Sequence, residues 1–174
     1  MNQEEDSLGH YSIDQSLYDY IRITLPEGST ILELGSGFGT SLLAKHYVMT
    51  SVEHDEQFLG KYDSTYLHVP LKEHKAIKNH PTTRWYDADK LRPKLEGLQY
   101  DMLLVDGPPQ TRSGFWKYFS MFDSKAIIVF DDLQRECERK LINSISSKLN
   151  CPYVVYGNGE GKPFGVINEP IFRT

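Results

Sequence analysis

The chain has 174 residues, of which 39% are hydrophobic, and a formal net charge of −5 with a sequence pI near 5.7. This length suits one buried core and is short for two. The acidic balance disfavours a nucleic-acid partner, which needs clustered Lys and Arg against phosphate, and two cysteines, Cys137 and Cys151, are too few for a disulfide framework or a metal cluster.

The N-terminal residues predict an intracellular chain. Residues 1–7 are acidic and lack the positive start and apolar core of a secretion signal, and no apolar run approaches membrane-spanning length. We therefore expect a cytoplasmic protein without a membrane partner. Residues 1–11 are expected to form a flexible tail before a single domain over residues 12–174, and His10 in that tail is either a solvated residue or a base folded over the site. The sequence leaves the oligomeric state open, a homo-oligomer included.

Strand and helix patterns alternate along the rest of the chain. Ser12 and Gln15 match a capping box ahead of apolar residues at helical spacing, which predicts a helix over about 14–24. Strands are expected at 30–34, 47–52, 83–86, 101–105, 125–130, 153–156 and 164–167, with helices between most of them. The alternation indicates an α/β fold, and the continuous apolar runs at 100–105 and 126–130 indicate strands covered on both faces.

The later segments predict how the sheet ends. Apolar residues at helical spacing indicate one long helix over 133–149, stopped by Pro152. The glycine-rich run 157–161 predicts an antiparallel hairpin between the last two strands. Residues 60–82 are the least readable, because 65–69 fits a short extra strand and 72–80 fits either a loop or a helix.

The stretch 31–40, ILELGSGFGT, is the most informative in the chain. An apolar strand runs through Glu33 into three alternating glycines, Gly35, Gly37 and Gly39. Glycine lets the backbone turn sharply and a ligand approach closely. A second acid, Glu53, ends the next apolar run, where it is placed to hold the two hydroxyls of a ribose. The combination indicates an adenosine-containing ligand, and the alternative is a plain strand-to-helix turn.

The loop spacing selects among adenosine ligands. A dinucleotide fingerprint reads G-x-G-x-x-G and seats a pyrophosphate on a helix N-terminus, whereas this loop reads G-x-G-x-G. The carboxylate of Glu33 would repel a pyrophosphate and suit an ammonium or sulfonium group, which favours S-adenosylmethionine. A nicotinamide-dependent oxidoreductase and a non-catalytic cofactor-binding module are the alternative functions.

On these motifs, E-x-G-x-G-x-G at 33–39 and an acid ending the second strand, residues 12–168 resemble the class I S-adenosylmethionine-dependent methyltransferases. The resemblance implies a Rossmann-like fold with a doubly wound, mostly parallel seven-stranded sheet and a C-terminal antiparallel hairpin. It places Glu33 at the amino-acid end of the cofactor and Glu53 at the ribose, with His54 beside it. The implied loop contacts are Gly35, Ser36, Gly37 and Gly39.

The resemblance also implies an adenine contact after the third strand, which we expect at 83–86. Asp87 matches the acid that accepts a hydrogen bond from the adenine amino group, with Ala88 beside the ring and Trp85 or Tyr86 available to stack. The equal alternative is that Asp87 or Asp89 only caps the following helix.

Three aspartates follow the next two strands: Asp106 after the fourth, and Asp131 and Asp132 after the fifth. Carboxyl ends of neighbouring parallel strands face one crevice, so these carboxylates are expected to converge. Together they would raise one another's pKa, and Mg²⁺ or a similar cation would relieve the repulsion. The alternative for Asp131 and Asp132 is an N-cap of the helix expected from Leu133.

The three aspartates resemble the metal site of the metal-dependent small-molecule O-methyltransferases, which implies that Asp106, Asp131 and Asp132 bind the ion. In that family the metal fixes an acceptor hydroxyl and lowers its pKa. By the same match Asp106 is the predicted catalytic residue and also borders the cofactor. The chain departs twice, with Asp132 in place of Asn and Pro109 in place of Lys, so the general base is unassigned.

The sequence as a whole therefore predicts methyl transfer from S-adenosylmethionine to a small-molecule acceptor, through an oxygen atom. The run Val-Asp-Gly-Pro at 105–108 also resembles divalent-metal methyltransferases of sugar hydroxyls or carboxyls, which makes a hydroxyl or a sugar-like compound the expected acceptor. Arg112 and Lys117 are either contacts to an anionic acceptor or part of an exposed helix face. The acceptor itself stays unidentified.

Overall fold

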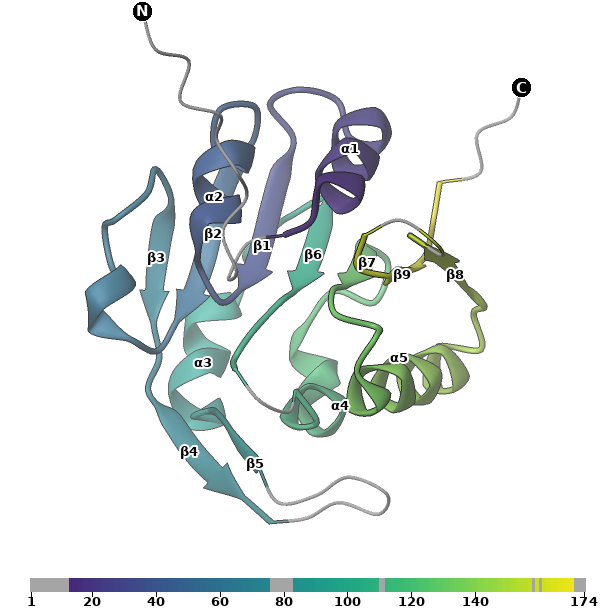
Figure 1. Cartoon of the computed structure of the whole chain (residues 1–174). Coiled ribbons are helices and arrows are strands. Elements are labelled where there is room, and N and C mark those ends of the chain that lie inside the picture. The colour runs from purple at the N-terminus through teal and green to yellow at the C-terminus, as the bar shows by residue number, and fades with distance from the viewer. Residues whose placement is uncertain (1–12, 76–82, 110–111, 158, 160, 171–174) are drawn as a thin grey trace, which may run out of the picture.

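Seven strands form one sheet in the computed structural model of the chain, which describes residues 13–75, 83–109, 112–157, 159 and 161–170 (Figure 1). The strand order is β3-β2-β1-β6-β7-β9-β8, and only β9 runs antiparallel to its neighbours. The strands are β1 (Thr30–Leu34), β2 (Val48–Glu53), β3 (Thr65–His68), β6 (Met102–Val105), β7 (Ile127–Phe130), β8 (Tyr153–Tyr156) and β9 (Phe164–Ile167). The predicted mostly parallel sheet with a terminal antiparallel hairpin is confirmed.

Helices cover both faces of this sheet (Figure 1). They are α1 (Gln15–Thr24), α2 (Phe38–Leu43), α3 (Ala88–Leu95), α4 (Gly114–Tyr118) and α5 (Glu136–Leu149), with 3-10 turns η1 (Glu56–Phe58) and η2 (Phe119–Met121). Side chains of α1 and α2 join the apolar core on one face, and those of α3, α4 and α5 join the core on the other.

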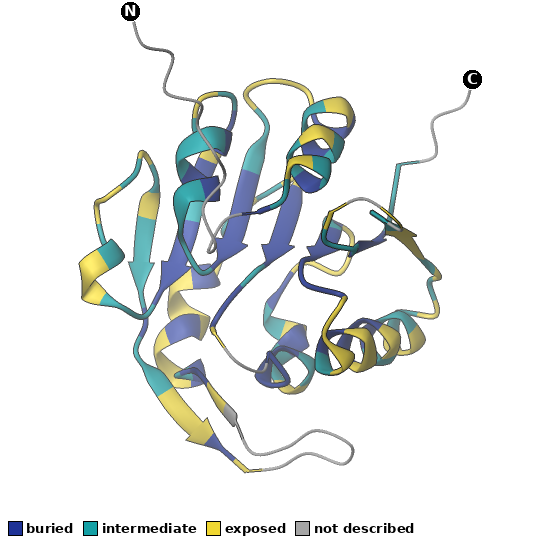
Figure 2. Cartoon of the chain, viewed as in Figure 1, coloured by how far each residue is buried: buried dark blue, intermediate teal, exposed yellow. Residues whose placement is uncertain are grey.

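The strands at the centre of the sheet are buried on both sides (Figure 2). Along β6, Met102 and Leu104 belong to one core while Leu103 and Val105 belong to the other, because successive strand residues point to opposite faces. This explains why β6 and β7 read as continuous apolar runs. In the described part of the chain, no helix is both long and apolar enough to cross a membrane.

The third strand lies elsewhere than the sequence predicted. β3, in the segment left open as a short extra strand, pairs parallel with β2 and completes the sheet. The strand expected to be third, β5 (Thr83–Tyr86), instead pairs antiparallel with β4 (Leu71–His74) in a separate two-stranded sheet. The propensity of 83–86 for strand was correct, but propensity carries no information about the pairing partner.

The two ends of the β4–β5 hairpin lie side by side. Leu71 pairs with Tyr86 at its base, and the backbone N–H of Asp87 donates to the carbonyl of Pro70 at 2.9 Å. Asp87 therefore lies next to the end of β3 although the hairpin separates the two in sequence.

The start of α1 differs from the predicted capping box. Asp14 is the N-cap, and its carboxylate accepts the backbone N–H of Gln15 at 2.7 Å. Ser12 lies outside the described residues, as does the predicted tail 1–11 with His10.

The start of α5 differs from the prediction. The helix begins at Glu136 rather than at Leu133, and Arg135 is its N-cap. It ends at Leu149, as predicted, but the residue that caps it is Asn150, which adopts the left-handed conformation with φ 49° and whose N–H bonds back to the last turn, rather than Pro152.

Two glycines allow the loops after β1 and β6 to touch. A Cβ on Gly107 would lie 2.8 Å from the Cα of Gly35 and 2.8 Å from the carbonyl oxygen of Leu34. Gly35 itself has φ +86°, a conformation that other residues rarely adopt. The two loops that frame the site are thus joined backbone to backbone.

We expect Gly107→Ala to lower the free energy of unfolding by about 3 kcal/mol, because a clash with backbone cannot be relieved by rotating a side chain. Gly97→Ala is the matched control: its φ is +76° but a Cβ there meets nothing within 4 Å. The control should lose only the conformational strain, about 1–2 kcal/mol. Urea unfolding measures both variants, and equal losses would contradict the close approach.

Candidate functional site

Glu33 lies buried beneath the loop after β1 and holds it in shape. Its Oε1 accepts hydrogen bonds from the hydroxyls of Thr40 at 2.8 Å and Ser51 at 2.5 Å, and the Thr40 hydroxyl accepts the N–H of Gly37 at 3.0 Å. Burial raises the pKa of Glu33 to about 8, against the two hydroxyl hydrogen bonds, and the charges of Asp106 and Glu53 add to the rise. At neutral pH Glu33 therefore carries a proton that a neighbouring cation would displace.

Glu53, at the end of β2, joins the loop after β1 to the loop after β2. Its Oε2 accepts the N–H of Ser36 at 2.8 Å, and its Oε1 accepts the N–H groups of His54 at 2.6 Å and Asp55 at 2.8 Å. The His54 ring Nδ1 lies 2.8 Å from Oε1 as an ion-pair contact without hydrogen-bond geometry. Burial acts to raise the pKa of Glu53, but the His54 ring and these N–H groups together hold it below its usual value, so the group is ionised.

The three loop glycines serve different purposes. Only Gly35 needs the left-handed conformation, while Gly37 has extended backbone and is the N-cap of α2, which begins at Phe38. A Cβ on Gly39 would lie 2.9 Å from the side chain of Ile13. Gly39 thus makes room for the segment before α1, a packing role that loop spacing alone does not reveal.

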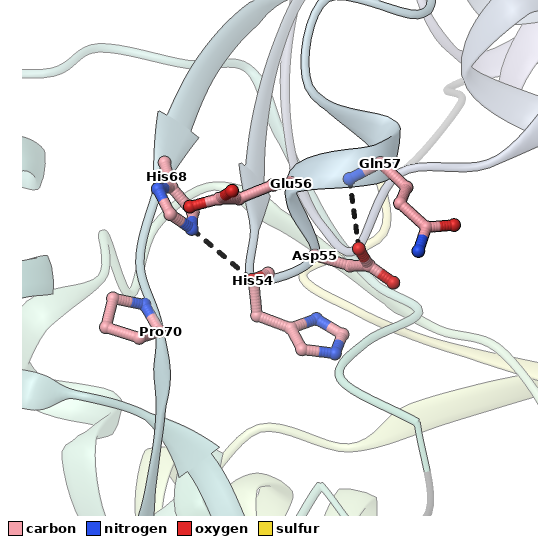
Figure 3. Close-up of a pocket in the computed structure, with 6 residues that line it drawn as sticks. All are labelled: His54, Asp55, Glu56, Gln57, His68 and Pro70. Carbon is pink, nitrogen blue, oxygen red and sulfur yellow. Dashed lines mark hydrogen bonds between the residues drawn. The ribbon is translucent and has the colours of Figure 1, made fainter.

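A cavity of about 530 Å³ opens beside Glu53 at the carboxyl ends of β2 and β3 (Figure 3). The cavity is wide open to solvent. Its wall mixes polar and apolar surface, and His68 Nε2 lies 3.3 Å from the backbone carbonyl of His54. The lining residues are His54, Asp55, Glu56, Gln57, His68 and Pro70.

Asp87 borders the wall of this cavity through its bond to Pro70, and it caps α3. Its Oδ1 accepts the N–H of Asp89 at 3.1 Å and lies 3.7 Å from Nζ of Lys72. The capping alternative is therefore what the contacts show, and the adenine contact of Asp87 stays a prediction, as does that of Ala88, the first residue of α3.

The expected stacking of adenine on Trp85 or Tyr86 is wrong, because both side chains are fully buried. Trp85 stacks instead on Tyr118, with ring centroids 5.4 Å apart and planes 11° apart. The Tyr86 hydroxyl donates to the carbonyl of Val52 at 3.1 Å. Both rings hold the β4–β5 hairpin against the domain rather than face a ligand.

The predicted convergence of the three aspartates is confirmed. Asp106, Asp131 and Asp132 each place a carboxylate oxygen within 4.8 Å of the others. Asp131 and Asp132 are buried, and the Asp106 side chain is 30% exposed, so it is the member that faces solvent. Neither Asp131 nor Asp132 caps α5, since that helix begins at Glu136, and Asp132 sits in a turn with φ 63°.

Arg112 lies inside this cluster, and the interpretation of it as a residue of an exposed helix face is wrong. Its side chain is 3% exposed, with NH2 3.1 Å from Oδ1 of Asp106 and 2.9 Å from Oδ2 of Asp132. It also donates to the carbonyls of Asp106 at 2.5 Å and Asp131 at 3.1 Å, and lies 3.9 Å from Glu138. Lys117, by contrast, is exposed. The sequence signal that could have placed Arg112 here was the group of three aspartates predicted to converge, which needed a positive charge nearby.

The aspartates differ in their pKa values because burial and the surrounding charges and hydrogen bonds act on each of them to a different extent. Burial raises the pKa of Asp131 to about 7, and the charges of Asp106 and Asp132 add to it. Burial also raises the pKa of Asp106. Although burial acts on Asp132 in the same direction, Arg112, the Gln134 hydrogen bond and Arg135 hold its pKa below the usual value. Asp132 is thus the ionised partner of Arg112.

These contacts fit a divalent cation poorly. Asp132 uses Oδ2 for Arg112 and for Arg135, which lies at 3.1 Å, and Oδ1 for the Gln134 amide at 3.0 Å; Asp131 Oδ1 accepts the N–H of Asp132 at 2.7 Å. A divalent ion bound to the same oxygens would lie within about 5 Å of the guanidinium, and at an effective dielectric constant of about 20 their repulsion is on the order of 7 kcal/mol.

We expect Asp131→Asn to remove a pH dependence of stability. Because the folded-state pKa of Asp131 is raised from 3.8 to about 7, its contribution is fully present below 3.8 and is lost as pH rises through about 7. Asparagine keeps an oxygen for the N–H of Asp132 but does not ionise. Denaturant unfolding between about pH 4 and 8 should show the variant more stable than the parent by a few kcal/mol at the upper end and little different at the lower end. Parallel curves would contradict the raised pKa.

No protein-family model matches the chain, and no curated protein matches it in sequence. Solved structures do match. A methyltransferase-like protein from Silicibacter pomeroyi has TM-score 0.55 and 21% identity, with 94% of this chain and 93% of that chain covered. A precorrin-6y C5,15-methyltransferase from Geobacter metallireducens has TM-score 0.54 and 12% identity, covering 96% and 94%.

The MycE methyltransferase of the mycinamycin biosynthetic pathway, in complex with Mg and SAH, has TM-score 0.52 and 15% identity, with 91% of this chain but only 48% of that chain covered. The chain likewise spans 58% of MtNAS, a structure in complex with MTA and tNA. The structures from Geobacter metallireducens and Silicibacter pomeroyi match 96% and 94% of this chain, so the likeness extends over nearly all of it. The chain therefore has the Rossmann-like fold of the class I S-adenosylmethionine-dependent methyltransferases.

Proposed function

We propose that the chain binds S-adenosylmethionine at the carboxyl ends of β1 and β2 and transfers its methyl group to an oxygen atom of a small molecule. The observation that carries this proposal is the position of two buried acids, Glu33 and Glu53, on either side of one sharply turned loop, beside a cavity of about 530 Å³. The shared fold and the SAH bound to the similar MycE support it.

The charge at this loop favours a cationic nucleoside over a diphosphate. Glu33 carries a proton in the free protein and would ionise beside the ammonium or sulfonium group of the cofactor. Glu53 is already ionised. Glu33 gives the pyrophosphate of a nicotinamide dinucleotide no counter-charge, whereas it can pair with a cation once it is ionised. A carboxylate accepts about four hydrogen bonds, and three N–H groups already bind Glu53. Ribose hydroxyls would therefore take the place of some of these N–H donors.

Methyl transfer to a hydroxyl needs alignment and the removal of one proton. The new oxygen–carbon bond forms as the carbon–sulfur bond breaks, and sulfur keeps the electron pair. Asp106 is proposed to take the hydroxyl proton, because its side chain is partly exposed and burial raises its pKa. The residue after it, Gly107, contacts Gly35, so Asp106 borders the cofactor loop. No step of this proposal passes through a metal, since the aspartates fit a divalent ion poorly.

The proposed acceptor is a hydroxyl compound of small size, such as a sugar-like molecule. The net charge of −5 disfavours a polynucleotide as the acceptor. The acceptor side of the site is acidic as well, because Asp106 is the solvent-facing member of its cluster. A carboxyl group there suits a neutral hydroxyl better than an anionic acceptor.

We expect Glu53→Ala to weaken the binding of S-adenosylhomocysteine by about tenfold or more, because both the proposed ribose acceptor and the link between the two loops are lost. Glu56→Ala is the control: it removes an exposed carboxylate from the same cavity wall and should change the affinity less than about twofold. Isothermal calorimetry measures both. Unchanged affinity in Glu53→Ala would remove the ribose assignment, and a thermal shift with NAD but not with S-adenosylhomocysteine would refute the function.

A second expectation follows from the proton on Glu33. Between about pH 5.5 and 7, where the α-amino group of S-adenosylhomocysteine stays charged, affinity should rise with pH, because binding of that cation displaces the Glu33 proton. Calorimetry at pH 7 in two buffers of different ionisation enthalpy should show proton release by the parent and none by Glu33→Gln. Equal proton release by both would assign the titrating group elsewhere.

A further inference from the structure

The aspartate cluster holds a buried cation, the side chain of Arg112. Arg112 reaches it from the segment between β6 and α4, and its guanidinium contacts groups on three separate elements. It pairs with Asp106 after β6 and Asp132 after β7, and lies 3.9 Å from Glu138 in the first turn of α5. The same guanidinium donates to the backbone carbonyls of Asp106 and Asp131.

The position of Arg112 within the cluster is central. Arg135 and Lys162 also approach Asp132, at 3.1 Å and 3.9 Å, but their side chains are 46% and 39% exposed, so they lie at its rim. Arg112 is 3% exposed and contacts carboxylates on both neighbouring strand ends. Among the described residues it is the buried cation shared by these carboxyl groups.

We propose that Arg112 is the resident cation of this cluster and takes the place where resemblance put a divalent metal. A guanidinium is planar, keeps its charge at every relevant pH, and presents several N–H donors in a rigid fork, so it can hold carboxylates from two strand ends without a metal to load. Through its bonds to both the side chain and the carbonyl of Asp106, it acts as the positioning residue for that group. This second role rests on the proposed function.

The first test is binding of Mn²⁺, followed by its paramagnetic resonance signal, to the whole chain and to Asp131→Asn. The parent should bind Mn²⁺ no more tightly than Asp131→Asn does, because the guanidinium already occupies the site. A parent site that Asp131→Asn weakens by about tenfold or more would be a genuine metal site at the aspartates and would overturn the proposal.

The second test removes the guanidinium. Arg112→Gln leaves the carboxyl groups of the cluster without their buried cation and should bind Mn²⁺ at least about tenfold more tightly than the parent, whereas Arg112→Lys, which keeps the charge, should not. Adding Asp131→Asn to Arg112→Gln should abolish the gain. A folded Arg112→Gln that binds Mn²⁺ no better than the parent would also overturn the proposal, and if this variant does not fold, the comparison of the parent with Asp131→Asn still decides.

Calorimetry with S-adenosylhomocysteine on the parent separates this proposal from the proposed function. Absence of cofactor binding would refute the function and, with it, the positioning of Asp106 for methyl transfer. The Mn²⁺ result would still decide whether Arg112 or a metal neutralises the aspartates.

Discussion

Negative charge buried at one edge of the sheet is the constraint on which this structure depends. Five carboxyl groups there are at most 4% exposed, namely Glu33, Glu53, Asp131, Asp132 and Glu138. Removing a carboxylate from water costs several kcal/mol unless hydrogen bonds, a counter-charge or a proton compensate it. The chain uses all three solutions: backbone N–H groups surround Glu53, a guanidinium contacts Asp132, and a proton resides on Glu33 at neutral pH and on Asp131 below about pH 7.

These solutions divide the edge of the sheet into a part whose protonation can change and a part whose ion pairs are fixed. The proton on Glu33 can leave when a cation arrives, so this group can respond to a ligand. The Arg112 network, in contrast, ties two strand ends and α5 together, and breaking it would leave buried charge without a partner. The glycine contact between the loops after β1 and β6 couples both parts, because Asp106 directly precedes Gly107.

The β4–β5 hairpin follows β3 at the same edge of the sheet. Trp85 packs so closely on α4 that a Cβ on Gly114 would lie 2.3 Å from its ring, and His74 contacts the Tyr118 hydroxyl at 3.0 Å. The hairpin is thus fixed to α4, the helix that follows Arg112. Its two ends meet at Pro70 and Asp87, and Pro70 is also part of the wall of the cavity beside β3.

The sequence by itself determined the fold class, the glycine loop, the acids at the ends of β1, β2, β6 and β7, and the convergence of the aspartates. Each of these follows from local patterns and from the rule that parallel strands end at one edge. Only the tertiary structure decided that 65–68 rather than 83–86 completes the sheet, that Trp85 and Tyr86 are buried, and that Arg112 lies among the acids. Those outcomes depend on contacts between residues far apart in the chain, and neither strand propensity nor charge at one position specifies the partner that a side chain will meet.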